Sequence, residues 1–338
     1  MIHRYRRQAK RKRQFLALAV AALATATVPG AAWAQARYAT QPIRLIVPYP
    51  AGGGTDFFAR SLAPGLGEAL GQQVIVENRP GASGMIGAQY VARQAPADGH
   101  TILLGDMTTY AVNPTMFEKQ QQYDVRKDLA PVTLAAKFDF LLVVNPSVVP
   151  ANTVADVVAA AARSPAGLSY ASPSIGSTHH LAMEMFAREA NAKLVAITYK
   201  GGGPAVQDLL AGQVGVMILD RATAKPHGEG GKLKPIAAAG AQRIALYPNV
   251  PTMAEQGIKG FDVEGWQGLT VRAGTPEPIV RAIAAAYAKT VASPELKKKL
   301  SEAGIDTTTS TPEQFAAYIQ AETVRWRNVI HDRNIKAE

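Results

Sequence analysis

A glycine triplet that follows an apolar segment has the clearest chemical meaning in this sequence. Residues 43–49 have the pattern of a strand, Gly52-Gly53-Gly54 comes next, and residues 55–70 have the spacing of an amphipathic helix. This order of strand, glycine turn and helix start presents bare backbone N–H groups at the positive end of a helix. Because glycine has no Cβ, a ligand can lie directly against the main chain. The sequence therefore predicts an anion-binding loop at this turn.

Two loops in the second half of the chain repeat the same arrangement. A predicted strand at 168–171 runs into the Ser/Gly-rich loop 172–178, which precedes a predicted helix at 179–190. A second strand, at 195–199, runs into Lys200-Gly201-Gly202-Gly203 and another helix start. Loops at the carboxyl ends of parallel strands line the ligand clefts of open α/β sheets. We therefore expect these loops and the glycine triplet to face one cleft between two domains.

Three charged residues lie where they could touch a ligand in that cleft. Asp56 lies in the first helical turn after the triplet, where a carboxylate either caps backbone N–H groups or contacts the ligand. Asp220 ends an apolar strand predicted at 214–220, with the same two interpretations. Lys200 is the cation placed within a glycine loop, and it is either a ligand contact or a solvated loop residue.

Several kinds of site are disfavoured by the spacing of the residues. Phe57 occupies the third glycine position of a dinucleotide-binding fingerprint, and no Gly-Lys-Ser/Thr follows the triplet, so a nucleotide site is not expected. No serine elbow is present to support a nucleophile. His180 and Glu184 are four residues apart, but the His-Glu-x-x-His pattern of a zinc site is absent. We predict no metal and no cofactor, and we expect His179 or His180 to close the turn beside the loop that ends at residue 178.

The positive charge of the chain is concentrated at its N-terminus. Of the 36 basic residues, seven lie in the first 13 positions; residues 15–28 are apolar and Ala32-Trp33-Ala34 follows. This is the layout of a secretory signal peptide cut after Ala34. The remaining chain has 29 basic and 26 acidic residues, a formal charge of +3, so composition gives no support for nucleic-acid binding. There is no cysteine for a disulfide or a lipid anchor, and we expect a free periplasmic protein.

The order of predicted elements indicates an α/β protein of two domains. Strands alternate with helices of a few turns, which favours βαβ units around a parallel sheet. The polar stretch 123–132 is expected to be a connection, and the glycine-rich stretch 224–231 has no predicted structure. The last third is mostly helical and is expected to pack back onto the first domain.

Linked motifs run through the whole mature chain and resemble those of one family. They are Val47 to Asp56, Val76 to Gly84, Asn113-Pro114, Asp128 to Val132, Ser174 to His179, Tyr199 to Ala205, Asp208 to Val214, Pro248 to Thr252, Glu255 to Gly257 and Ala273 to Pro276. In this order they resemble the Bug family of extracytoplasmic solute receptors, the TctC-like binding proteins of tripartite tricarboxylate transporters.

The resemblance implies a type II periplasmic binding protein, with two α/β domains joined by crossover strands and a ligand cleft between them. It implies a receptor, not an enzyme, that captures a di- or tricarboxylate, an acidic amino acid or an aromatic acid and delivers it to the membrane subunits of the transporter. A monomer is expected. The expected divisions are the signal peptide at 1–34, domain 1 at 35–137 with 267–338, and domain 2 at 138–266.

The resemblance also implies the residues of the two cleft walls. The first wall would comprise Tyr49, Ala51, Gly52, Gly53 and Asp56, with Thr108 nearby. The second would comprise Ser174, Gly176, Ser177, Thr178, Tyr199, Lys200, Gly201 and Asp220.

The chain departs from the family pattern in the second wall. Arg221 stands where the family often has asparagine, and residues 269–272 are less apolar than is usual. These departures bear on which ligand is bound. Two alternatives to a transport receptor use the same cleft: an exported enzyme acting on a small carboxylate, and a ligand sensor for a two-component kinase.

Overall fold

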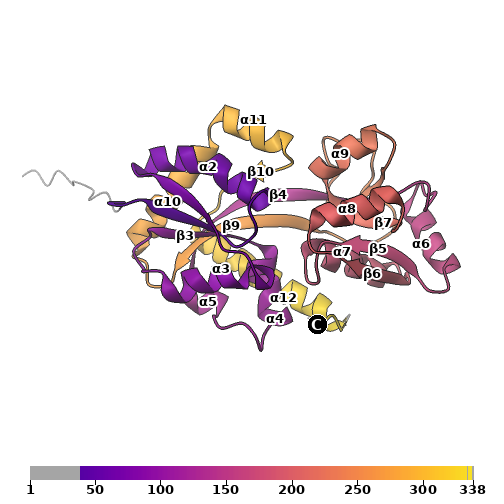
Figure 1. The fold of residues 1–338 in the computed structure, drawn as a ribbon, viewed down its shortest axis with the longest axis horizontal. Coiled ribbons are helices and arrows are strands. Elements are labelled where there is room, and N and C mark those ends of the chain that lie inside the picture. The colour runs from indigo at the N-terminus through magenta and orange to yellow at the C-terminus, as the bar shows by residue number, and fades with distance from the viewer. Residues whose placement is uncertain (1–38, 333, 337–338) are drawn as a thin grey trace, which may run out of the picture. The chain divides into compact units, whose positions relative to one another are not determined.

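The structure is a computed structural model that describes residues 39–332 and 334–336. The predicted signal peptide, residues 1–34, lies outside the described residues. From Ala39 onward the chain forms one compact unit in which strands and helices alternate (Figure 1).

Ten strands join in one curled sheet. Along its main path the order is β2-β1-β3-β9-β4-β7-β5-β6, and β8 and β10 pair with β4 off this path. The strands are β1 (Ile43–Val47), β2 (Val74–Asn78), β3 (Thr101–Asp106), β4 (Leu129–Val144), β5 (Leu168–Ser172), β6 (Leu194–Thr198), β7 (Val216–Asp220), β8 (Lys234–Ala238), β9 (Glu264–Arg272) and β10 (Asp306–Thr307).

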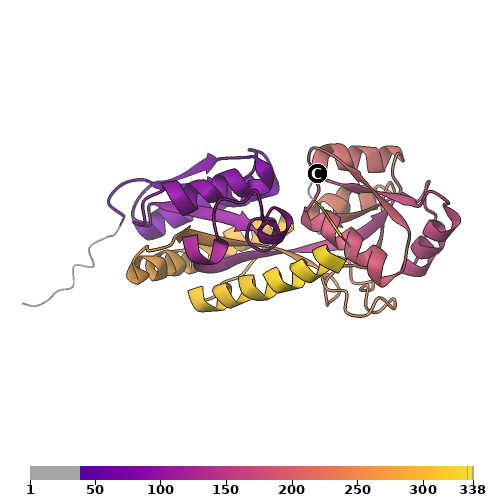
Figure 2. The ribbon, with the colours of Figure 1, turned by 90° about the horizontal axis from the view of Figure 1, so that it is seen from below.

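The helices lie on both faces of this sheet (Figures 1 and 2). The longer ones are α2 (Gly54–Leu70), α6 (Val154–Arg163), α7 (Thr178–Glu189), α8 (Gly202–Ala211), α9 (Arg221–Glu229), α10 (Glu277–Val291), α11 (Pro294–Glu302) and α12 (Pro312–Asp332). The short helical turns are η1 (Ala82–Gly84), α3 (Met85–Gln89), η2 (Tyr90–Gln94), η3 (Thr108–Val112), α4 (Asn113–Met116) and α5 (Val125–Asp128).

Two long antiparallel strands, β4 and β9, carry the sheet from one lobe to the other. β4 pairs with β9 from Leu129 to Asp139 and then, from Phe140 onward, with β7 and β8. The first lobe therefore contains β1, β2, β3 and β10, and the second contains β5 to β8. The expected parallel pairing is present for β1 with β2 and β3 and for β5 with β6 and β7. In the middle it is wrong, because both crossing strands run antiparallel to their neighbours.

The polar stretch 123–132 contains the main error in the predicted elements. It was expected to be a connection, but β4 already begins at Leu129. Leu129 and Val132 are buried, and pairing with β9 satisfies the backbone there despite a register shift after Pro131. Burial and pairing with a distant strand thus override the local polarity of the sequence.

The glycine-rich stretch 224–231 is also more ordered than the sequence suggests. Residues Arg221–Glu229 form helix α9, with Pro226 inside it. Arg221 and Ala224 of this helix are buried, which anchors its first turn to the second lobe. A short helix with poor intrinsic propensity is stabilised by such packing.

The C-terminal helices return to the first lobe as predicted. α10 packs against α2, and α12 packs along β4 and η3, with Phe315, Ile319 and Trp326 buried (Figure 2). The end of α12 also reaches α7 of the second lobe, where Arg188 donates to Asp332 at 2.8 Å.

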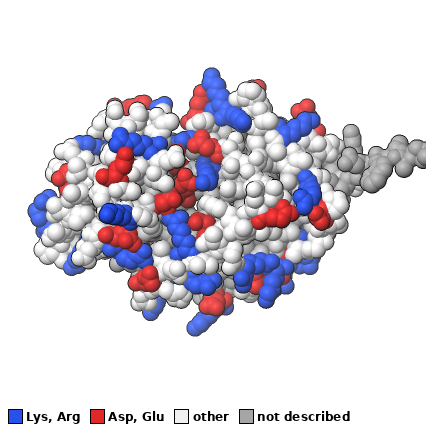
Figure 3. Space-filling model, turned by 180° about the vertical axis from the view of Figure 1, so that it is seen from behind, with Lys and Arg blue, Asp and Glu red and all other residues white. Residues whose placement is uncertain are grey.

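The surface carries both signs of charge. On the face in Figure 3, lysine and arginine side chains are interspersed with aspartate and glutamate, and no field of one sign covers it. Within residues 39–332 and 334–336, no helix combines the length and the apolar character needed to cross a membrane.

Candidate functional site

A hollow of about 740 Å³ lies where the two lobes meet. Its walls come from the start of α2 and the end of β3 in the first lobe, the starts of α7 and α9 in the second, and the crossing strands between them. The loop between α11 and β10 closes one side. This volume is within the range of small-molecule sites in proteins. The position and the size both indicate a ligand cleft.

The glycine triplet forms the first wall, as its sequence suggests. Gly53 is the N-cap of α2 in an extended conformation (φ −82°, ψ 171°), and Gly52 has φ +85°, which favours glycine. A Cβ at Gly54 would have no neighbour within 4 Å, and one at Gly53 would find only the Pro50 carbonyl oxygen, at 3.7 Å. The first N–H groups of a helix have no intrahelical partner. The loop therefore presents backbone donors to open space in the cleft.

Asp56 fixes the conformation of this loop through hydrogen bonds made outside the cleft lining. Its Oδ2 accepts hydrogen bonds from the Gly52 N–H and the Arg60 Nε, both at 2.9 Å, and its Oδ1 accepts one from the Asn78 Nδ2 at 2.9 Å. The same amide also donates to the Tyr49 carbonyl. The hydrogen bond from Arg60, with those from Gly52 and Asn78, lowers the pKa of Asp56 to about 2. Asp56 is 4% exposed and is not among the residues that line the cleft.

A carboxylate at the end of β3 also faces the cleft. Oδ1 of Asp106 accepts hydrogen bonds from the Tyr49 hydroxyl at 2.6 Å and from the Thr109 backbone and hydroxyl at 2.9 Å. Burial raises the pKa of Asp106, while the hydrogen bonds from Tyr49 and Thr109 oppose that rise. Tyr49 thus positions Asp106 and does not itself line the cleft.

The crossing strand β9 adds a residue that sequence reasoning did not single out. Gln267 is 5% exposed, and its Nε2 donates to the Thr55 hydroxyl at 2.6 Å. Within the described part of the chain, its buried Oε1 has no hydrogen-bond partner. A buried amide oxygen without a partner costs free energy, which a ligand or a bound water would recover. No local pattern marks Gln267 as a site residue, because it has the spacing of an ordinary polar position in a strand.

The second wall is built around Asp220 and His179. Their side chains approach to 3.5 Å between Nε2 and Oδ2, and the His179 ring lies edge-on to Phe140, with ring centroids 5.0 Å apart. Partial desolvation in the cleft acts to raise the pKa of Asp220, whose side chain is 45% exposed, but the hydrogen bond and charge of His179 lower it below its usual value. This wall therefore presents an ionised carboxylate beside an aromatic surface.

The loop before α7 is fixed by its own side chains. Ser177 is the N-cap of α7, and its hydroxyl accepts a hydrogen bond from the His180 N–H. The Nδ1 of His180 accepts one from the Gly176 N–H at 3.2 Å. His180 thus closes the first turn, one of the two histidines expected to do so. In the described residues, no group of three or more histidine, aspartate or glutamate side chains is gathered as for a metal ion.

Arg221, the departure from the family pattern, points away from the cleft. Its guanidinium pairs with Asp139 on β4 at 2.5 Å and with Asp306 on β10 at 2.8 Å. It therefore joins the second lobe to the crossing strand and to the first lobe. The departure changes the contact between the lobes, not the charge of the cleft wall.

The structure brings only part of the predicted site together. Gly52, Gly53, Thr178 and Asp220 line the cleft. The other ten predicted residues do not line it in this structure: Tyr49, Ala51, Asp56, Thr108, Ser174, Gly176, Ser177, Tyr199, Lys200 and Gly201. Tyr199 instead donates to Asp208 at 2.9 Å, and Lys200 is exposed. Ligand contact by these residues stays a prediction.

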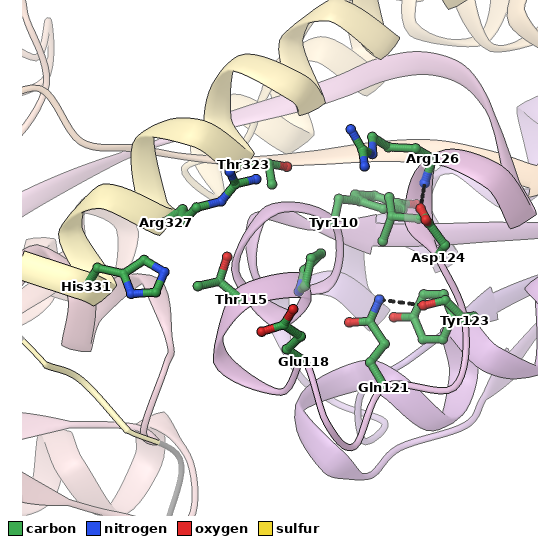
Figure 4. Close-up of a pocket in the computed structure, with 12 residues that line it drawn as sticks. Tyr110, Thr115, Glu118, Gln121, Tyr123, Asp124, Arg126, Thr323, Arg327 and His331 are labelled. Atoms are coloured by element: carbon green, nitrogen blue, oxygen red, sulfur yellow. Dashed lines mark hydrogen bonds between the residues drawn. The ribbon is translucent and has the colours of Figure 1, made fainter.

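A second hollow has a volume of about 530 Å³ (Figure 4). It lies between α12, which contributes Thr323, Arg327 and His331, and the segment from α4 to α5. None of the residues predicted for the site lines it. The cleft between the lobes is therefore the better candidate for the principal site.

Fold and site together define a class: a two-lobed solute-binding protein whose cleft lies beside crossing strands. Residues 58–335 match the tripartite tricarboxylate transporter family receptor model, TctC. The chain belongs to this family.

Relatives with solved structures agree with this placement. The structure of R. palustris Rpa4515 with adipate is 34% identical, with a TM-score of 0.80, and covers 88% of this chain and 98% of its own. The structure of the periplasmic binding protein BugD is 30% identical, with a TM-score of 0.77, and covers 88% and 99%. A UPF0065 protein of Pseudomonas sp. (strain P51) is 36% identical over 321 residues, 95% of this chain and 94% of the relative. The family and the structural neighbours are solute-binding proteins, and the predicted fold class is confirmed.

Proposed function

We propose that this protein is a periplasmic receptor that captures a small organic carboxylate in the cleft between its lobes. The observation that carries the proposal is the start of α2, where Gly53 and Gly54 present N–H groups that donate to no described residue, at the wall of a cleft of suitable size. Backbone donors at a helix start bind a carboxylate without a fixed cation. The adipate bound by Rpa4515 supports a carboxylate as the ligand class.

Capture requires the two walls to approach one another. A ligand that touches both walls favours the closed arrangement over open ones. The crossing strands β4 and β9 are the connection about which the lobes would move, and we place the domain boundaries at 137/138 and 266/267. Ser174, Gly176, Ser177, Tyr199, Lys200 and Gly201 would then reach the ligand on closure, while Tyr49, Ala51, Asp56 and Thr108 support the first wall.

Export and delivery complete the proposal. The basic and apolar N-terminus with Ala32-Trp33-Ala34 supports cleavage after Ala34 and release into the periplasm. Family membership supports the membrane subunits of a tripartite tricarboxylate-type transporter as the partner of a monomeric receptor.

A thermal-shift screen of organic acids tests the proposal. At about 100 times its Kd, a true ligand stabilises the folded protein by about 2.7 kcal/mol. We expect one structurally related group of carboxylates to raise Tm and unrelated acids to leave it unchanged. A wide panel of mono-, di- and tricarboxylates that produced no shift would contradict the proposal.

Recovery of the ligand separates a receptor from an enzyme that uses the same cleft. After prolonged incubation with the protein, the ligand should be recovered chemically unchanged and bound at one equivalent per chain. A time-dependent loss of ligand with accumulation of a product would instead show turnover.

A further inference from the structure

The charged side chains that line the cleft are mainly acidic. Asp106, Asp220 and Glu302 contribute three carboxylates. Among the described residues that line it, there is no lysine or arginine, and His179 is the side chain there that can carry a positive charge. A ligand with two carboxylates would bring the second one into this acidic surface. Like charges at a binding surface disfavour the wrong partner.

Three cations near the cleft are already engaged by acidic groups of the protein. Arg60 pairs with Asp56, Lys137 with Glu264, and Arg221 with two carboxylates outside the cleft. Lys299 lies with its Nζ 5.5 Å from the Phe57 ring centroid, but it is not part of the lining. Because the neighbouring arginines and Lys137 pair with other acids, they leave the negative charge of the cleft lining largely uncompensated.

The body of the cleft is aromatic. Phe57, Phe138 and Phe140 line it, and Trp266 lies on the crossing strand beside them. Phe57 is 38% exposed, although it is a large apolar side chain. Aromatic rings beside carboxylates provide a surface for a flat apolar group and attract a cation over their faces. The cleft thus has backbone donors and Asp106 at its first wall, Asp220 at its second wall, and aromatic rings in the lining between the two lobes.

This arrangement identifies a class of ligand. We propose that the carboxylate received at the start of α2 belongs to a zwitterion: a monocarboxylate with a flat apolar body and a protonated nitrogen directed to Asp220 on the opposite wall. Asp106, on the same wall as the donors, already accepts three hydrogen bonds at its Oδ1. Asp220 has a side chain that is 45% exposed, so it is accessible to the ligand's cation. The inference rests on the proposed function and narrows it.

Calorimetric titration with three para-substituted benzoates tests the proposal. The probes are para-aminomethylbenzoate, para-methylbenzoate and terephthalate, which share the ring and one carboxylate and differ in the charge of the second group. At neutral pH we expect para-aminomethylbenzoate to bind about tenfold or more tightly than terephthalate, with the neutral analogue between them. The pair 6-aminohexanoate and adipate repeats the comparison on a flexible carbon chain. We expect 6-aminohexanoate to bind more tightly than adipate.

Variants assign the preference to the cleft. Asp220→Asn should weaken binding of para-aminomethylbenzoate and strengthen that of terephthalate, which reduces the ratio of their affinities. Glu229→Gln, an exposed acid on α9 outside the cleft, is the matched control and should leave the ratio unchanged. Equal or tighter binding of the dianions, or an unchanged ratio in Asp220→Asn, would overturn the inference. So would a failure of all five probes to bind. The proposed function would survive each of these results if other carboxylates bind in the wide screen.

Discussion

Asp56 illustrates what a single residue contributes to this site. The sequence left open whether its carboxylate caps the helix or touches the ligand. In the structure both oxygens are used by Gly52, Arg60 and Asn78, and the side chain is buried behind the loop. Its function is to hold the glycine loop in the conformation that presents the backbone donors. A preorganised loop spares the ligand the entropic cost of ordering it.

The pH dependence of stability should report this role. The pKa of Asp56 is lowered to about 2 in the folded state, chiefly by its hydrogen bond from Arg60, and is about 3.9 in an unfolded chain. The unfolded state therefore binds more protons between about pH 4 and pH 2, and the contribution of Asp56 is lost as the pH falls through this window. In Asp56→Asn, we expect a shallower decline of the urea midpoint over this range than in the wild type. An identical decline in both proteins would show that the network contributes nothing to stability.

At the residue scale, sequence reasoning found backbone features more readily than side-chain positions. The glycine triplet and Thr178 could be placed in the cleft because each lies in a predicted loop that follows a strand, and Asp220 because it ends one. Gln267 could not be found, because its role depends on the approach of β9 to α2, which local pattern does not encode. Tyr49 carries a motif signal, but its hydroxyl turns inward to Asp106.

At the scale of elements, local sequence patterns predict most helices and parallel strands, but not the elements that depend on the crossing strands and on distant contacts. Helices and parallel strands follow local periodicity, so β1, α2, β5 and α7 were placed within a few residues. The early start of β4 and the helix α9 depend on contacts with segments far along the chain. Local polarity therefore predicts a connection where β4 begins, and the glycine-rich composition of residues 224–231 does not predict α9.

Arg221 forms ion pairs that connect the two lobes. Arg221→Gln removes the partner of Asp139 and Asp306, which are only partly exposed. Because one side of this network is buried and the other is open to solvent, we expect a loss of about 1 to 3 kcal/mol in the free energy of unfolding. Arg243→Gln, which breaks an exposed pair with Glu255, is the control and should cost clearly less than Arg221→Gln, because solvent screens an exposed pair. Equal costs in chemical denaturation would argue against a structural role for the Arg221 ion pairs.

Gly268 on β9 tests the packing of α12 against the crossing strands. A Cβ at this position would come within 2.0 Å of the Phe315 ring, so the helix would have to shift. Gly268→Ala should lower the free energy of unfolding by about 1 to 3 kcal/mol. At Gly203, near the start of α8, a Cβ meets nothing within 4 Å. Gly203→Ala should instead be neutral or stabilise by up to about 1 kcal/mol, because it restricts the unfolded chain. Similar midpoints for the two variants would contradict this packing.

At the scale of the whole molecule, a receptor that captures its ligand by closure must change the arrangement of its two lobes when the ligand binds. The cleft lies between α2 on one side and α7 and α9 on the other, and β4 and β9 are the strands that cross beside it in the described part of the chain. Saturating carboxylate should reduce the radius of gyration measured by small-angle X-ray scattering. A ligand that bound tightly without any change in the scattering curve would show that this cleft does not close on its ligand.

Direct titration of Gly53→Val tests the central claim, that a carboxylate binds against the backbone at the start of α2. Gly53 has an extended conformation that valine can adopt, and the nearest protein atom to its Cβ is 3.7 Å away, so the fold should survive. Replacement of this cap should cost only about 1 kcal/mol of stability. For a carboxylate found by the thermal-shift screen, isothermal titration should show Kd raised by about 100-fold or more, on the order of 3 kcal/mol. Wild-type affinity in a folded Gly53→Val protein would place the ligand elsewhere and contradict the account.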